Sequence, residues 1–247
     1  MKIRNLMLCC LAFLLLFSFN AVAGKKVVLA SLDWEPYIGS SMKENGYVAE
    51  VVREAFKRKG YDLEIKFMPW ARVVKMSKAG KFDGYFPEYF AEELKKDFKI
   101  SSPFPGGPLG FYKRKGTDIK FSSIEDLKPY TIGVVRGYVN TKEFDEATYL
   151  KKEEVKDDLL NFRKLFKKRI DLVVADKFVG KYVVGKEIPD KLAELEFVDP
   201  PLENKDLYVC ISKKTTGPNL KFKAFQEGLK EIIADGTVQK ILKKHGF

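Results

Sequence analysis

Histidine and cysteine, the side chains most often used for nucleophilic catalysis and zinc binding, are scarce in this chain of 247 residues. His245 is the only histidine, and Cys210 is the only cysteine outside an apolar run near the N-terminus. One histidine and one cysteine cannot supply a histidine-based triad, a Cys/His pair or a zinc cage. No D-x-D-x-D-G loop and no phosphate-cradling glycine loop occurs. We therefore expect no cofactor and no activated nucleophile, while a metal site made of carboxylates alone stays open.

Acidic, cationic and aromatic side chains gather instead where the predicted strands end. These positions are 33–37, 87–89, 136–140 and Asp176. In open α/β sheets, ligands lie beyond the carboxyl ends of the strands. A buried ammonium group needs an acid, and a buried carboxylate needs a cation or several N–H donors. The pattern favours reversible binding of a small polar molecule.

The first third of the chain predicts alternating strands and helices that would position these side chains. Short apolar or alternating segments at 26–30, 63–67 and 82–86 are typical of strands. Between them, apolar residues recur at helical spacing from Val48 to Phe56 before Gly60, and Pro69 opens a second helix. Strands separated by helices predict a parallel sheet covered by helices.

A stretch with three prolines and three glycines at 103–110 interrupts this alternation and is a candidate hinge. After it, strands are predicted at 130–135, 170–175 and 207–211, with helical patterns between and beyond them. Cys210 lies in the last of these strands, where it is expected to be a small buried apolar residue. Two successive α/β units predict two lobes that close on a ligand between them.

The N-terminal residues have the pattern of a secretory signal peptide. Lys2 and Arg4 precede an apolar run from residue 6 to 19, and A-V-A at 21–23 fits cleavage after Ala23. An uncleaved anchor and lipoprotein processing at the N-terminal cysteines fit less well, because the run is short and continues past both cysteines. Cleavage would leave 224 residues with a net charge of +9, since the segment holds two of the excess cations and no acid. Export makes nucleic acid a poor partner, whereas anionic membrane or cell-wall polymer stays possible.

The chain resembles the type II periplasmic solute-binding proteins, in the family 3 extracellular group that serves polar amino-acid ABC transporters. The resemblance covers the whole predicted mature chain and rests on short motifs in a fixed order. These are W-E-P-Y at 34–37, a helix start at 46–50, P-W-A-R at 69–72, G-K-F-D at 80–83, I-S-S-P-F at 100–104, I-E-D-L at 124–127, I-G-V-V at 132–135, the segment 171–176, A-D-G-T at 234–237 and K-H-G at 244–246.

The resemblance implies an α/β fold with two lobes, each a mixed, mostly parallel sheet covered by helices, and two hinge strands joining them. Lobe 1 would comprise residues 24–106 plus 208–247, and lobe 2 residues 107–207. It further implies a periplasmic, monomeric and non-enzymatic protein that binds a small polar solute and works with an ABC permease in the inner membrane. Sensing on the same fold, or a dehydratase that uses Glu88 with Asp176 or Glu35, are the alternatives.

The resemblance also assigns roles to individual residues. Trp34 and Trp70 match the aromatic platform, and the segment 136–140 matches the anion-binding loop of lobe 2. Asp176 matches the acid that receives the ammonium group of the ligand. The whole set of candidate ligand-binding residues is Trp34, Trp70, Arg72, Glu88, Arg136, Tyr138, Asn140 and Asp176.

One element of the family pattern is missing. Family members usually carry an arginine that binds the carboxylate, in a T-x-x-R motif, but here Leu94 or Lys95 occupies that position. Arg72 and Arg136 are candidate replacements, because arginine presents a fork that suits a carboxylate. Glu88 beside the acid of lobe 2 favours a cationic or polyamino ligand. Each residue also has a structural alternative: a core position for Trp70, a solvated surface for Arg72 and Glu88, and a helix N-cap for Asp176.

Overall fold

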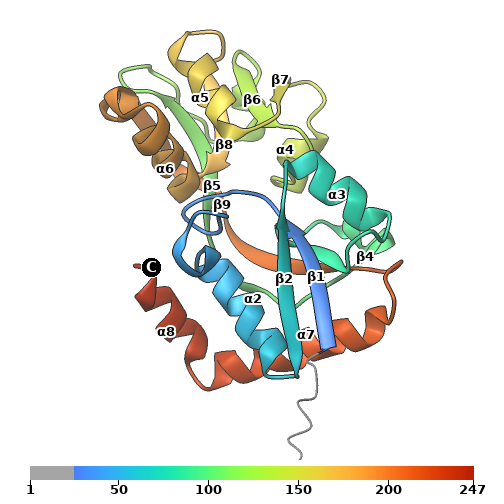
Figure 1. The fold of residues 1–247 in the computed structure, drawn as a ribbon. Coiled ribbons are helices and arrows are strands. Elements are labelled where there is room, and N and C mark those ends of the chain that lie inside the picture. The colour runs from blue at the N-terminus through green and yellow to red at the C-terminus, as the bar shows by residue number, and fades with distance from the viewer. Residues whose placement is uncertain (1–24) are drawn as a thin grey trace, which may run out of the picture.

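The computed structural model describes residues 25–247, so the predicted signal peptide lies outside the described residues. The described chain folds into an α/β structure with nine hydrogen-bonded strands, eight of them in one continuous path (Figure 1). The strands are β1 Lys25–Ser31, β2 Tyr61–Phe67, β3 Gly84–Glu88, β4 Phe98–Ile100, β5 Phe104–Arg114, β6 Thr131–Val135, β7 Lys151–Val155, β8 Leu172–Asp176 and β9 Leu195–Ser212. Their order in space is β2-β1-β3-β9-β5-β8-β6-β7, with β4 also paired to β9.

Helices cover both halves of this path. The α-helices are α2 Tyr47–Lys57, α3 Trp70–Lys78, α4 Lys142–Glu146, α5 Asp158–Phe166, α6 Lys177–Glu187, α7 Pro218–Ala234 and α8 Thr237–Lys244. Short 3-10 helices are η1 Lys43–Asn45, η2 Glu92–Lys96, η3 Ile124–Leu127 and η4 Pro189–Glu194. No helix within residues 25–247 combines the length and the apolar character that crossing a membrane requires.

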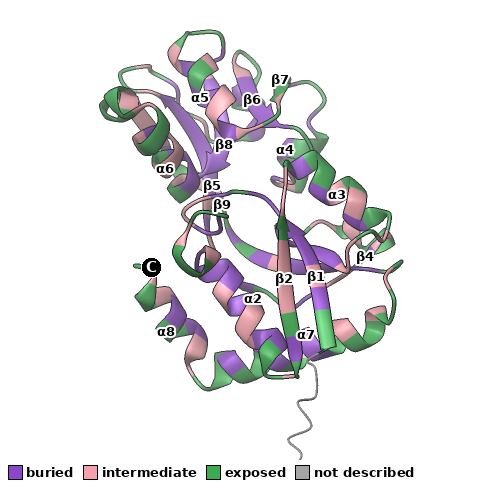
Figure 2. Cartoon of the chain, in the orientation of Figure 1, coloured by how far each residue is buried: buried purple, intermediate pink, exposed green. Residues whose placement is uncertain are grey.

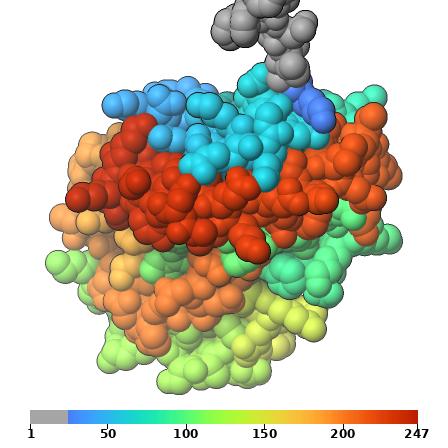
Figure 3. All heavy atoms as spheres, turned by 90° about the horizontal axis from the view of Figure 1, so that it is seen from below, coloured from blue at the N-terminus to red at the C-terminus, as the bar shows by residue number. Residues whose placement is uncertain are grey.

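The first lobe is built on the parallel strands β1, β2 and β3, as the alternation of strands and helices predicts. The end of β9 joins them antiparallel to β3. Helices α2 and α7, far apart in sequence, pack together, and Phe56 and Phe225 lie with ring centroids 5.2 Å apart. Gly228 permits this close approach, because a Cβ at that position would lie 1.9 Å from the carbonyl oxygen of Ala55. Figure 3 shows the C-terminal helices, orange to red, covering this face beside the blue to cyan N-terminal segment.

The second lobe is built on β8, β6 and β7, which run parallel to one another, with β5 antiparallel to β8. Strand β8 is buried along its whole length (Figure 2). A separate core cluster forms here, in which Tyr112 packs edge-on against Phe162 at 5.4 Å and against Phe197 at 5.0 Å. The second lobe therefore has an apolar cluster of its own, beside a larger one that runs through both lobes.

Strands β5 and β9 connect the lobes and pair with each other along their length, from Phe104 opposite Leu207 to Arg114 opposite Leu195. The proline- and glycine-rich stretch at 103–110 thus forms the first half of a strand. The pairing register shifts between Pro105 and Pro108, and an irregular ladder tolerates prolines because fewer backbone donors are required there. Two crossing strands match the predicted architecture.

Strand β7 has a charged sequence, K-K-E-E-V, which would also fit the solvated face of a helix. In the structure it is an edge strand beside β6. Charged side chains are common on edge strands because they discourage pairing with other chains, so local charge alone does not distinguish the two cases.

Candidate functional site

A small cavity lies between the lobes, where the strand ends of the first lobe face the loop that follows β6. Its volume is about 30 Å³, which is room for two or three water molecules. Its walls are mostly apolar and aromatic. The lining residues are Leu32, Trp34, Trp70, Pro87, Glu88, Tyr89, Tyr138, Val139 and Leu207.

The two tryptophans reach the cavity from different elements of the first lobe. Trp34 follows β1 in a tight turn, in which its backbone N–H donates to the carbonyl of Ile38 at 2.8 Å. Trp70 is the first residue of α3, directly after Pro69, whose fixed φ suits a helix start. Both side chains are buried. The strand-end position of Trp34 and the proline before Trp70 are the sequence signals that place them here.

Aromatic rings surround the cavity from both lobes. Trp34 and Tyr89 of the first lobe lie edge to face, with centroids 5.8 Å apart. Trp70 meets Tyr138 of the second lobe at the same centroid separation and an interplanar angle of 90°. The indole Nε1 of Trp70 also donates to the carbonyl of Gly137 at 2.8 Å. The tryptophan of the first lobe is therefore bonded to the predicted anion-binding loop of the second lobe.

Glu88, the last residue of β3, is the acid of this cavity and is only 5% exposed. Its carboxylate accepts one hydrogen bond from the hydroxyl of Tyr85 at 2.9 Å and one from the backbone N–H of Tyr89 at 2.8 Å. Burial raises the pKa of Glu88 to about 8, although these two hydrogen bonds and Lys205 act in the opposite direction. A carboxylate can accept about four hydrogen bonds, so part of its capacity remains open.

Asp176, at the end of β8, is 2% exposed and does not line the cavity. One carboxylate oxygen caps α6 by accepting from the backbone N–H groups of Phe178 and Val179 at 2.8 and 3.1 Å. The other accepts from the hydroxyl of Tyr37 at 2.9 Å and from that of Tyr89 at 3.4 Å. Burial raises the pKa of Asp176 to about 6. The structure thus places this acid as an N-cap and as a contact between the lobes.

The remaining predicted residues lie away from the cavity walls. The side chain of Arg136 is exposed and pairs with Glu154 at 3.1 Å within the second lobe. Asn140 is buried, and its amide nitrogen and backbone N–H both donate to Asp145. Arg72 is exposed in the first turn of α3, and among residues 25–247 its guanidinium makes no hydrogen bond or ion pair. The structure therefore brings together Trp34, Trp70, Glu88 and Tyr138, while direct ligand contacts by the others stay predictions.

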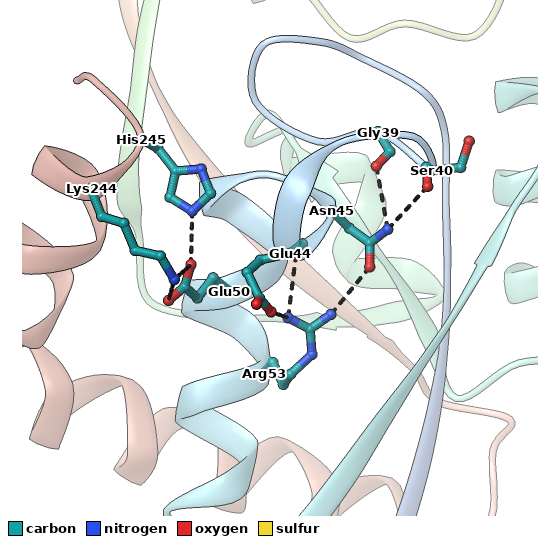
Figure 4. Close-up of polar contacts among 8 residues, drawn as sticks. All are labelled: Gly39, Ser40, Glu44, Asn45, Glu50, Arg53, Lys244 and His245. Carbon is teal, nitrogen blue, oxygen red and sulfur yellow. Dashed lines mark hydrogen bonds and ion pairs between the residues drawn. The ribbon is translucent and has the colours of Figure 1, made fainter.

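The segment after the turn that carries Trp34 is held by the side chains of Asn45 on η1 and Arg53 on α2 (Figure 4). The amide nitrogen of Asn45 donates to the carbonyl oxygens of Gly39 and Ser40, each at 3.4 Å. Arg53 in turn donates to the amide oxygen of Asn45 at 3.2 Å. These bonds fix the path of the chain between β1 and α2.

The C-terminal end packs beside the same turn. Glu50 on α2 lies 2.7 Å from the ammonium of Lys244 and 2.7 Å from Nε2 of His245 (Figure 4). Burial favours a higher pKa for Glu50, but the bonds from these two residues lower it overall. Phe247 then stacks on Tyr37 with centroids 5.6 Å apart. The only histidine thus has a structural partner on α2 of the first lobe.

Comparison with known proteins agrees with this architecture. The model of a family described as "Bacterial extracellular solute-binding proteins, family 3" matches residues 27–247, nearly all of the described chain. The chain belongs to this family. The L-cystine-binding protein TcyJ of Escherichia coli (strain K12) is 23% identical to it, with 91% of this chain and 84% of that protein covered.

Solved structures share the fold of this family member at low sequence identity. A histidine kinase sensor domain with similarity to periplasmic binding proteins has a TM-score of 0.78 at 17% identity and covers 91% of this chain and 97% of its own. An ancestral arginine-binding protein bound to arginine has a TM-score of 0.76 at 23% identity and covers 91% and 100%. The two-lobed fold of type II periplasmic binding proteins is therefore the fold of this solute-binding protein.

The segment in which the family arginine is expected contributes nothing to the cavity walls. Leu94 and Lys95 both lie on η2. Leu94 packs against the core, and Lys95 pairs with Glu92 at 2.9 Å on the surface. This solute-binding protein therefore has neither an arginine nor a lysine among the residues that line the cavity.

The set of ligand-binding residues predicted from the sequence lacks three polar residues that contact the surroundings of the cavity. Asp158, the first residue of α5, accepts from the hydroxyl of Tyr138 at 3.2 Å, and burial raises the pKa of its carboxyl to about 7. Lys205 on β9 is 7% exposed, and its ammonium lies 5.3 Å from the ring centroid of Tyr89. Tyr37 bonds to Asp176 across the lobes. Tyr37 belongs to the strand-end segment 33–37, but no local pattern signals the other two.

Proposed function

We propose that this family member is an exported, periplasmic solute-binding protein. It captures a small amino acid or related amine between its lobes and delivers it to an ABC permease in the inner membrane. The observation that carries the proposal is the cavity between the lobes, walled by aromatic rings from both and containing one buried acid, Glu88. Aromatic walls with few polar groups are typical of small-molecule sites. Capture and release require no reaction.

Contacts between the lobes support a closing mechanism. The Trp70 indole donates to Gly137 at 2.8 Å, and the Tyr37 hydroxyl donates to Asp176 at 2.9 Å. On the surface, Lys186 pairs with Glu35 at 2.6 Å. The cavity, of about 30 Å³, is small for an amino acid, which supports lobes that part to admit one. Two crossing strands allow such a hinge motion.

The relatives support an amine-containing solute. They include proteins that bind L-cystine and arginine, both of which carry ammonium groups. The predicted signal peptide and the extracellular family support export, and the family supports a transport role. The departure at Leu94 and Lys95 is the reason why the ligand of these relatives cannot simply be transferred to this chain.

Binding can be measured with the two tryptophans of the chain, because both line the cavity. Mature protein is purified, co-purifying small molecules are identified by mass spectrometry, and amino acids, polyamines and small acids are screened by thermal shift and by tryptophan fluorescence. We expect at least one amine to raise the melting temperature and to change the fluorescence together. If binders shift melting but leave both tryptophans unaffected, the ligand site lies elsewhere and the proposal fails.

A further inference from the structure

We propose that the cavity recognises a cationic nitrogen through Glu88 and the aromatic rings around it, and that it does not bind the carboxylate of an amino acid. The ligand class is then a small organic amine or quaternary ammonium compound. This inference rests on the proposed function, because it names the chemistry of the solute that the same cavity takes.

Charge in the cavity walls is the first argument. Among the nine residues that line it, Glu88 alone carries a carboxyl group, and none is a lysine or an arginine. A ligand carboxylate placed here would lose its hydration beside a second carboxyl group and gain no cation. Burial of an unpaired charge is strongly unfavourable, whereas a cation would find a carboxyl group that can ionise to become its counter-charge.

The rings supply the second argument. Trp34, Trp70, Tyr89 and Tyr138 all line the cavity. The faces of aromatic rings attract cations, tryptophan most strongly, and the attraction increases when the cation is desolvated. An acid combined with several rings therefore suits an ammonium group that carries apolar substituents. The same rings offer a carboxylate no comparable stabilisation.

The hydrogen bonds of the two buried acids distinguish Glu88 from Asp176. Asp176 accepts four hydrogen bonds and does not line the cavity. Glu88 accepts two and does line it. An acceptor with open capacity at the cavity wall is the group that a ligand N–H can reach without breaking an existing bond.

Lys205 is the buried cation near the cavity that could bind the carboxylate of a ligand. Its ammonium pairs with Glu203 at 3.2 Å and lies over the ring of Tyr89, and it is not part of the cavity lining. It already has an acidic partner and an aromatic one. We therefore assign Lys205 to the support of Tyr89 and make its removal an arm of the test.

Cation binding should release a proton from Glu88. The ionisable groups around its carboxyl are Tyr85 on the same strand, Cys210 and Lys205 on β9, and Asp145 and Tyr138 from the second lobe. Among these, Lys205 favours ionisation of Glu88 and Asp145 opposes it. Burial leaves the carboxyl largely protonated near neutral pH, and a bound cation would favour the charged form. Binding should therefore release up to about one proton at pH 7.

Matched pairs of probes test whether the carboxylate of the ligand contributes to binding. L-arginine is compared with agmatine, and L-cystine with cystamine, because each second member lacks the carboxylate and keeps its cationic nitrogen. Tetramethylammonium and acetate are the minimal probes for charge. Affinities are measured by tryptophan fluorescence and calorimetry, the latter in two buffers of different ionisation enthalpy to count protons. We expect each amine to bind at least as tightly as its amino acid, tetramethylammonium to compete, and acetate not to.

Variants test whether Glu88 is responsible for amine binding and for the release of the proton. Glu88→Gln imitates the protonated carboxyl and should weaken the amines by roughly tenfold or more, since a charge-assisted hydrogen bond is lost. It should also abolish the proton release. Glu92→Gln, at a glutamate with a 69% exposed side chain on η2, is the matched control and should change neither quantity. Lys205→Met should weaken the amines far less than Glu88→Gln does, because Lys205 acts on the cavity only through Tyr89 and Glu88 and does not line it.

Two results would overturn the inference while leaving the proposed function intact. One is an amino acid that binds tenfold or more tightly than its amine and changes tryptophan fluorescence. The other is binding that survives Glu88→Gln but is lost in Lys205→Met, which would identify a carboxylate partner. A screen in which no solute of any class affects the tryptophans would instead contradict the proposed function itself.

Discussion

Two buried acids at the ends of two strands have different surroundings. Asp176 ends β8 in the second lobe, and Glu88 ends β3 in the first. Both are almost fully buried, and burial raises the pKa of both, to about 6 and about 8. Four donors contact Asp176, and two contact Glu88. The smaller pKa shift of Asp176 is consistent with its larger number of donors, because hydrogen bonds to the charged form stabilise it.

A strand-end position alone does not make an acid a ligand partner. Asp176 begins α6, and the free N–H groups of that helix take one of its oxygens. Glu88 is followed by no helix with free N–H groups directed at it, and its side chain stays at the cavity wall. The element after each strand therefore decides whether the acid holds the protein together or faces a ligand.

The largest expected effect is on stability as a function of pH. Glu88, Asp158 and Asp176 have pKa values raised to about 8, 7 and 6. The native state then binds more protons than the unfolded state, whose acids titrate near pH 4. The free energy of unfolding should fall as pH rises from about 5 to 8, by several kcal/mol in total. Urea denaturation at intervals of half a pH unit measures this decline.

Variants should separate the two acids within that pH range. Glu88→Gln should remove the part of the decline nearest pH 8, and Asp176→Asn only the part below about pH 6, because each penalty stops growing above the native pKa of its group. Stability that is flat or rising from pH 5 to 8 in the wild type would show that these carboxyls are already ionised in the native protein.

The next effect is the loss of a structural acid. Asp176→Ala removes the N-cap of α6 and leaves the Tyr37 hydroxyl without its acceptor, so we expect a loss of roughly 3 kcal/mol in the free energy of unfolding. Glu88→Gln should cost much less at pH 7, because it replaces a protonated carboxyl by an amide of similar shape. Asp199→Ala, at an exposed carboxylate, is the control. Equal losses in the free energy of unfolding for Asp176→Ala and Glu88→Gln would show that the two acids do not differ in their structural role.

A smaller effect concerns the contact between the lobes. Tyr37→Phe deletes the hydrogen bond to Asp176 and keeps the ring, so it should favour parted lobes by about 1 kcal/mol, roughly a fivefold change in the closing equilibrium. Small-angle scattering of the ligand-free protein should then show a larger radius of gyration. Tyr149→Phe removes an exposed hydroxyl that bonds to Glu125 within lobe 2 and should change nothing. An unchanged radius in Tyr37→Phe would mean that other contacts alone hold the lobes together.

Much of the fold could be predicted from the sequence because its signals are local. The helical spacing from Val48 to Phe56 predicts α2, and alternation predicts β2. Strand β9 could not be predicted in full, because its first half contains two prolines and several acids and becomes a strand only by pairing with β5. Non-local pairing of this kind leaves no periodic pattern in the sequence.

The candidate site divides in the same way. Trp34 and Glu88 lie at strand ends, Tyr138 lies in the loop after β6, and Trp70 begins a helix after a proline; these local signals bring them to the cavity. Local signals also point to Asp176, yet its distance from the cavity wall depends on α6 and on Tyr37. The roles of such residues depend on partners far away in sequence, which only the folded structure brings together.

The smallest expected effect tests the arginine that the sequence suggests as a replacement for the missing family residue. Arg72 lies two positions after Trp70 but is exposed and does not line the cavity. Arg72→Lys and Arg72→Ala should therefore change the affinity for agmatine by less than about twofold, within the range of surface substitutions. The affinity for L-arginine should change equally little if the cavity does not bind its carboxylate.

A tenfold loss of affinity for L-arginine in Arg72→Lys, with the affinity for agmatine unaffected, would mean that the guanidinium of Arg72 binds a carboxylate outside the cavity. A lysine ammonium cannot reproduce the two parallel bonds of an arginine. Glu88 would then bind the amine of the ligand while Arg72 binds its carboxylate, and the protein would bind intact amino acids.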